Sequence, residues 1–163
     1  MADWICNTSP IQYLHQLGQL DLLRTLATAV FVPPAVANEL LNGMGLGIDL
    51  PDLKTAPWIS VHAIQSNVPP QWKNKLGPGK AEVLQLAPEM PGSCVILDDR
   101  IARTFADEFK LPFKGTLGIL LDAKRAGLLA AVRPFIDQLN GLGFRLAPAT
   151  RAHVPRLAGE PTS

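Results

Sequence analysis

Short apolar segments alternate with amphipathic segments along most of the chain. The amphipathic segments carry apolar residues at spacings of three and four, which predicts helices. The apolar segments are typical of buried strands, and the alternation of the two favours an α/β fold with a parallel sheet covered on both faces. Strands are expected at residues 4–6, 29–32, 58–64 and 93–97, with a short extended segment at 112–115.

Local signals mark the ends of the predicted helices. Thr8 and Ser9 are capping side chains, and Pro10 follows them in the first turn of a helix. Gly18 ends that helix, and a proline pair at 33–34 opens another. Helices are expected at 10–17, 20–26, 34–41, 80–87, 101–109, 117–126, 130–142 and 150–157, and a last edge strand at 144–146.

Two long segments have no clear period. Residues 43–57 are rich in Gly and Pro but carry Leu46, Ile48 and Leu50. They suit either a mobile flap or a surface loop packed by its own apolar side chains, and an exposed apolar patch there would favour a partner protein. Residues 65–76 are expected to be a polar linker.

The composition narrows the class of protein. A chain of 163 residues suits one domain, residues 1–163, with a real core, and 47% hydrophobic against 18% charged residues indicates a globular protein. The net charge of +1 gives no electrostatic argument for nucleic acid, which would need a local basic patch. Because no apolar stretch suits a bilayer and the N-terminus lacks signal-peptide features, we expect no membrane and a cytoplasmic location.

Cys6 and Cys94 both lie in predicted strands. They are expected to be small buried apolar residues rather than a disulfide or a metal-binding pair. The histidines, at 15, 62 and 153, have no metal-ligand spacing.

The apolar run 93–97 ends in Asp98 and Asp99 and leads directly into a predicted helix. Sites in open α/β sheets lie outside the carboxyl ends of the strands. Since neighbouring side chains alternate in extended chain, we expect Asp98 to point into the crevice. Asp99 is expected either to cap the helix or to support the residues that line the crevice. Arg100 and Arg103 either bind phosphate or pair with acids such as Asp99.

Two further acids have similar settings. Glu39 shares a helical stripe with Val36 and Leu40, so we expect it to lean toward the apolar face. Glu82 lies in the first turn of its helix, where an acid also interacts well with the helix dipole. Acids that meet at one sheet edge suggest a divalent-metal site and chemistry on phosphate, although Asn7 stands where such a site would want an aspartate.

Five segments in order resemble the PIN-domain family, and within it a VapC-like branch. They cover nearly the whole chain and lie at 5–11, 32–40, 79–83, 95–103 and 115–118. The resemblance implies a three-layer α/β/α sandwich with a central parallel sheet of four or five strands. It also implies metal-dependent ribonuclease activity, with many members acting as toxins paired with a small antitoxin protein and many forming dimers.

The family's acids carry over onto this chain position by position. Glu39, Glu82 and Asp98 match acids and are the expected metal ligands, while Asn7 is an amide at the position of the first aspartate. The fourth acid falls near Gly118, which has no side chain. Beyond these positions, Asp122 lies one helical turn further on, and Lys80 adds a positive charge near Glu82.

Two functions follow from this set. The first is an endoribonuclease that cleaves single-stranded RNA with Mg²⁺ or Mn²⁺ held weakly by Glu39, Glu82 and Asp98, while Asn7 and Thr116 complete the catalytic set and Thr116 positions phosphate or water. The second is a catalytically degenerate PIN domain that binds RNA or a partner protein without cleaving. We also expect a homodimer.

Overall fold

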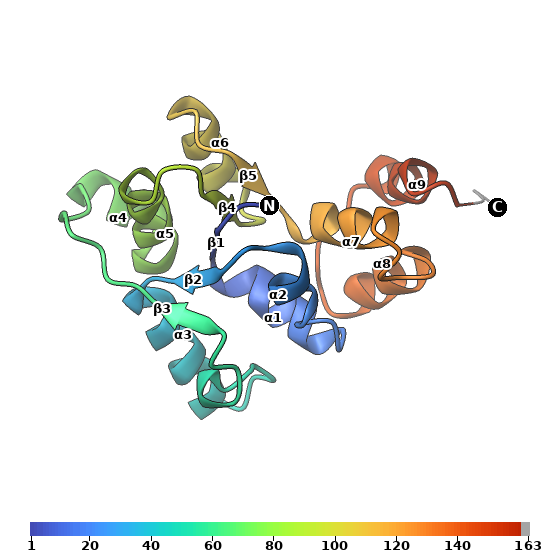
Figure 1. Ribbon diagram of the computed structural model, residues 1–163, viewed down its shortest axis with the longest axis horizontal. Coiled ribbons are helices and arrows are strands. Elements are labelled where there is room, and N and C mark those ends of the chain that lie inside the picture. The colour runs from blue at the N-terminus through green and yellow to red at the C-terminus, as the bar shows by residue number, and fades with distance from the viewer. Residues whose placement is uncertain (161–163) are drawn as a thin grey trace.

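The computed structural model describes residues 1–160, and a five-stranded parallel sheet forms its centre (Figure 1). The order is β3-β2-β1-β4-β5, and each adjacent pair is parallel. This arrangement with helices on both sides confirms the expected α/β/α fold. Residues 161–163 of the expected single domain lie outside the described residues. The strands are β1 (Trp4–Cys6), β2 (Val30–Val32), β3 (Ile59–Val61), β4 (Cys94–Ile96) and β5 (Phe113–Lys114).

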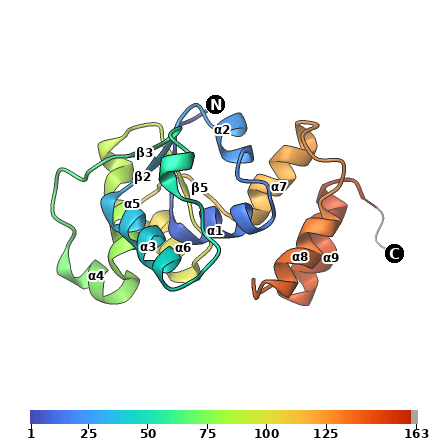
Figure 2. The ribbon, with the colours of Figure 1, turned by 90° about the horizontal axis from the view of Figure 1, so that it is seen from below.

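Helices connect successive strands, as parallel pairing requires. In Figures 1 and 2, α8 and α9 lie beside each other, beyond α7. The helices are α1 (Thr8–Gln16), α2 (Leu22–Leu26), α3 (Pro34–Gly45), α4 (Pro70–Leu76), α5 (Pro78–Glu89), α6 (Arg100–Glu108), α7 (Thr116–Arg125), α8 (Arg133–Gly141) and α9 (Pro148–Leu157).

The core is built around the two central strands. Ile5 of β1 and Val95 of β4 are opposite each other in register and have no exposed surface. Helix α5 packs against both strands and buries Leu84 and Leu86. The two central strands are thus buried in the core, and the polar residues lie just beyond their carboxyl ends, at one edge of the sheet.

The structure corrects several sequence predictions. Helix α1 begins at Thr8 rather than at residue 10, with Asn7 as its N-cap residue, so Thr8 and Ser9 lie inside the helix and do not cap it. Residues 144–146 form no strand, because Gly143 turns the chain at φ +90° and Phe144 then packs edge-on against Tyr13, 5.0 Å between ring centroids. The expected linker contains helix α4, which Pro70 opens. The helix predicted from residue 130 begins only at Arg133, since Val132 is its N-cap residue.

Residues 43–45 complete α3, which runs past its predicted end at residue 41. The rest of the 43–57 segment is a surface loop that is partly packed by its own side chains. Leu50 is buried against Gly43 of α3, whereas Leu46 and Ile48 are exposed. A short 3₁₀ helix, Leu53–Thr55, lies within it. The interpretation as a surface loop packed by its own apolar side chains is therefore confirmed for Leu50 and not for Leu46 and Ile48.

Both cysteines are free thiols, as expected. Cys6 is buried, which raises the pKa of its thiol, and Cys94 is half-buried. Within residues 1–160, no helix combines the length and apolar character that crossing a membrane would need.

Candidate functional site at the carboxyl edge of the sheet

Asn7 and Asp98 lie at the ends of two adjacent strands. Cys6 pairs with Ile96 in register, and the Asn7 amide donates to the Ile96 carbonyl at 2.9 Å. Asn7 is only 2% exposed, and its Oδ1 has no hydrogen-bond partner among the described residues. A buried amide oxygen without a partner is costly, so this atom requires a donor or a cation that the protein itself does not supply.

Thr116 holds the carboxylate of Asp98. Its backbone N–H donates to Oδ1 at 2.8 Å and its hydroxyl donates to Oδ2 at 2.6 Å. Gly115 permits this approach, because a Cβ there would lie 2.8 Å from Oδ1. Burial raises the pKa of Asp98, while the two hydrogen bonds from Thr116 and the positive charge of Arg103 oppose that rise. As predicted, Asp98 lines a crevice.

Glu39 reaches from α3 to two other elements. The Thr8 hydroxyl donates to Oε2 at 2.5 Å, and the Gly79 N–H donates to Oε1 at 3.2 Å. The side chain is exposed, so the expectation that it leans into the apolar face is wrong; Val36 and Leu40 fill that face instead. Gly79 has to be glycine for this contact, since a Cβ there would meet the Glu39 carboxylate.

Glu82 makes the reciprocal contact from α5 to α3. Its Oε1 accepts from the Ala35 N–H at 3.1 Å. Ala35 lies in the first turn of α3, and Gly79 lies in the first turn of α5. Neither helix has a side-chain cap of its own, so each is capped by an acid from the other.

Asp99 caps its own helix, as predicted. Its Oδ2 accepts from the Ala102 N–H at 2.9 Å, and its Oδ1 pairs with Lys80 at 3.3 Å. The partner of Asp99 is thus Lys80 rather than Arg100 or Arg103. Asp122 pairs with Lys114, the side chain of which lies beside Gly118, so it does not replace the missing fourth acid.

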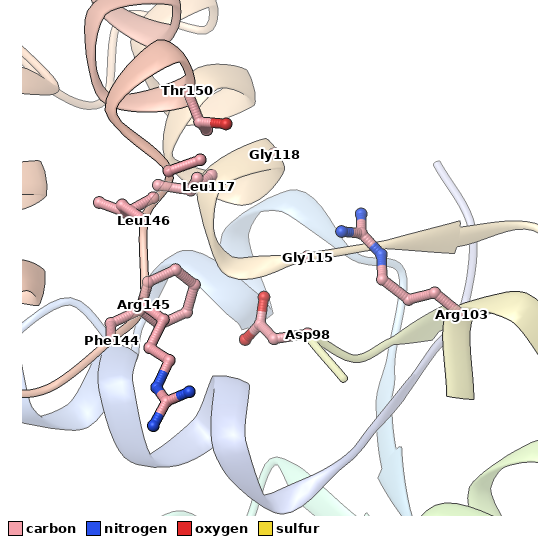
Figure 3. A pocket seen from close by; sticks show the side chains of 10 residues that line it. Asp98, Arg103, Gly115, Leu117, Gly118, Phe144, Arg145, Leu146 and Thr150 are labelled. Atoms are coloured by element: carbon pink, nitrogen blue, oxygen red, sulfur yellow. The ribbon is translucent and has the colours of Figure 1, made fainter. Parts of the chain in front are cut away.

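Three adjoining hollows share Asp98 and form what we call the edge groove. Figure 3 shows one of them, with Asp98 between the guanidinium groups of Arg103 and Arg145. The segment after α8 forms one wall. The residues that characterise the groove are Tyr13, Lys80, Asp98, Arg103, Phe113 and Arg145.

The fold and these motifs agree with a comparison to known families. The PIN-domain family matches residues 3–160. The chain belongs to the PIN-domain family. No curated protein matches it. PIN domains are nucleases as a class, act on RNA and generally use divalent metal ions. The residues at the carboxyl edge of the sheet are therefore compared with the ligands that such an ion needs.

The amide oxygen of Asn7 and the carboxylate oxygens of Asp98 are the kind of ligand that a hard divalent cation prefers. Residues 1–160 contain no group of three or more His, Cys, Asp or Glu side chains placed to hold a metal. The amide of Asn7 is outside that set, however, and contributes a buried free oxygen next to β4, which Asp98 follows by two residues. Mg²⁺ commonly takes one or two carboxylates and completes its shell with water and substrate phosphates, so the donors suit a weakly held ion rather than an all-protein cage.

The sequence did not reveal the basic wall of the groove. Arg145 follows a segment that was predicted as a strand, and the groove's charged residues are far apart along the chain. Their proximity follows from the path of the chain between α8 and α9. The net charge of +1 does not indicate that basic residues gather on one wall of the groove.

Proposed function

We propose that this PIN domain is a metal-dependent endoribonuclease that hydrolyses phosphodiester bonds of single-stranded RNA. The observation that carries the proposal is a pair of oxygen donors on adjacent strand ends, the partnerless Oδ1 of Asn7 and the carboxylate of Asp98. The proposed metal ligands are Asp98 and Asn7. The other two expected ligands, Glu39 and Glu82, cap α5 and α3, and residues 1–160 contain no group of three acids placed around one ion. Bound Mg²⁺ or Mn²⁺ would activate water and shield the charge that develops on the phosphate.

The chain's own residues have distinct roles in this proposal. Asp98 accepts a proton from the water that attacks phosphorus, while the bond from phosphorus to the leaving ribose oxygen breaks and that oxygen takes a proton from solvent. Asp98 is placed for this role because its carboxylate lines the crevice. Thr116 fixes the orientation of its carboxylate.

The test is cleavage of a mixed-sequence single-stranded RNA with Mn²⁺ or with EDTA. We expect cleavage with Mn²⁺ only, and a loss of about 100-fold or more in Asp98→Asn, because loss of a positioned proton acceptor costs about that much. Asn7→Asp should increase activity, since it adds the missing negative charge.

Asp137→Asn is the matched control, because Asp137 lies on α8 and, within residues 1–160, pairs only with Arg151, 2.9 Å away. It should cleave like the wild type. Equal cleavage by Asp98→Asn would place the activity elsewhere, and no cleavage by the wild type or by Asn7→Asp would refute the nuclease proposal.

A second candidate is a PIN domain that binds RNA or a protein without cleaving. One observation favours it: Glu39, Glu82 and Asp98 all accept hydrogen bonds from the protein, as structural acids do. Metal-independent RNA binding without cleavage by any variant would support this candidate.

The toxin role belongs to the same proposal, with a small antitoxin as partner, a homodimeric state and a cytoplasmic location. Leu41, Leu46 and Ile48 support a protein partner, because they are exposed apolar side chains on or beside the 43–57 loop. Light scattering of the purified chain tests the dimer. Growth arrest on expression, abolished in Asp98→Asn, tests the toxin role.

A further inference from the structure

The lining of the edge groove carries one more positive than negative charge. Four cations line it against three acids, and two of those acids are already engaged. Asp99 pairs with Lys80, and both oxygens of Asp98 accept from Thr116. The charged lining residues are Lys80, Arg100, Arg103, Arg145, Asp98, Asp99 and Asp107.

Two arginines of this groove lie on either side of Asp98 (Figure 3). Arg103 comes from α6, and its guanidinium lies over the Phe113 ring at 5.0 Å from the centroid. Arg145 comes from the segment between α8 and α9 and is exposed; among the described residues its guanidinium has no hydrogen-bond or ion-pair partner. The guanidinium of Arg145 is thus free to bind an anion bidentately, and that of Arg103, although it lies over Phe113, forms no hydrogen bond or ion pair among the described residues.

Backbone dipoles add to the positive potential between them. Leu117 and Gly118, in the first turn of α7, and Thr150, in the first turn of α9, line the same hollow as the arginines. Asp98 already accepts from the first N–H of α7, whereas α9 has no side-chain cap at its N-terminus. The partial positive charge of the α9 end therefore reinforces the arginines.

Aromatic side chains lie between the cations. Tyr13 and Phe144 line the groove near Arg145, and Phe113 lines it beneath Arg103. A positive groove with interspersed aromatic rings is what single-stranded nucleic acid needs, because phosphates follow the charges while bases stack on the rings. A free phosphate would use the charges but not the rings.

We propose that Arg103 and Arg145 bind two backbone phosphates of a single-stranded RNA, one on each side of the phosphate that lies at Asp98. The RNA then follows the edge groove from Phe113, across Asp98, to Phe144 and Tyr13. The identity of the nucleic acid as RNA rests on the proposed function. The binding itself needs neither metal nor cleavage.

The test measures the salt dependence of binding in EDTA, with the intact chain and a fluorescent single-stranded RNA of about 12 nucleotides. Each lost phosphate contact reduces the slope of log K against log salt by about 0.7 for a single strand. We expect that reduction in Arg145→Gln and in Arg103→Gln, and about twice as much in the double variant.

Arg125→Gln is the matched control, because Arg125 is an exposed arginine at the opposite end of α7. Its slope should equal that of the wild type, and circular dichroism should show that every variant folds. Since the exposed Arg145 has no partner among the described residues, its replacement leaves the fold intact.

Three results would overturn the inference: unchanged slopes in both groove variants, an equal reduction in Arg125→Gln, or binding of inorganic phosphate with no binding of RNA. Reduced slopes in a protein that cleaves nothing would support the groove and refute the nuclease proposal. Metal-dependent cleavage with unchanged slopes would support the nuclease proposal and refute the binding of RNA phosphates by Arg103 and Arg145.

Discussion

Replacing Glu82 by alanine should destabilise the fold whether or not the protein is a nuclease. The change removes the acceptor of the Ala35 N–H, in the first turn of α3. Ala35 is buried, 9% exposed, and Pro33 supplies no side-chain cap. The freed N–H therefore has no substitute within the protein, and α3 loses the negative charge at the positive end of its dipole.

The expected loss is about 2 kcal/mol. A hydrogen bond to a charged group contributes about 1.5–3 kcal/mol, and the half-buried position of Glu82 favours the lower part of that range. For a chain of this size, a loss of about 2 kcal/mol lowers Tm by about 4–8 °C. It also shifts a urea midpoint downward by about 1 M.

Urea unfolding, followed by far-UV circular dichroism, measures the effect in three variants. Glu82→Gln should recover about half the loss, since a neutral amide oxygen still accepts from Ala35. Glu108→Ala is the control, because Glu108 is an exposed acid at the C-terminal end of α6, and it should unfold like the wild type. An alanine variant at position 82 within about 0.5 kcal/mol of the wild type would refute the capping role.

Two further predictions concern charge at the carboxyl edge. Burial raises the pKa of Asp98, so the folded state binds the proton of this carboxyl more tightly than the unfolded chain does. The ionised carboxylate therefore destabilises the folded state. This destabilisation is absent at low pH, where the group is protonated in both states, and it grows as pH rises through the raised pKa. Urea melts should therefore show Asp98→Asn gaining stability relative to the wild type from about pH 4 to about pH 7, and a constant difference would contradict this. Asn7→Asp buries a second carboxylate, so its Tm in EDTA should be lower than that of the wild type and its gain with Mn²⁺ larger; equal gains would count against metal binding here.

The sequence predicts most of the fold because the strands are short, apolar and separated by helices with clear start signals. β1 and β4 were placed to within a residue, since both are buried on both faces. Helix α4 was missed because it is short and mostly polar, with one buried residue, Leu76. The strand predicted at 144–146 failed because alternation alone does not reveal a positive φ at Gly143 that directs the chain to Tyr13.

The site was predicted at the level of which residues meet, and not of what they contact. Parallel strand ends bring Asn7 and Asp98 to one edge, as the pattern implied. Thr116, which only the family resemblance indicated, holds the Asp98 carboxylate there. The contacts of Glu39 and Glu82 depend on how α3 lies against α5, which no local pattern encodes. Arg145 joins the groove only through the loop between two terminal helices, so its sequence neighbourhood carries no signal.

Reciprocal capping changes how variants of these acids have to be interpreted. An alanine at Glu39 or Glu82 removes a negative charge and also frees an N–H in the first turn of the other helix. Lost activity in such a variant is explained equally by a disordered edge and by a missing ligand. Glutamine separates the two, since its oxygen keeps the cap while the charge needed for a cation is lost. If the glutamine variants retain stability and lose activity, Glu39 and Glu82 contribute their charge to the reaction. If the variants retain both, these acids only cap helices, and any nuclease chemistry depends on Asp98 and Asn7.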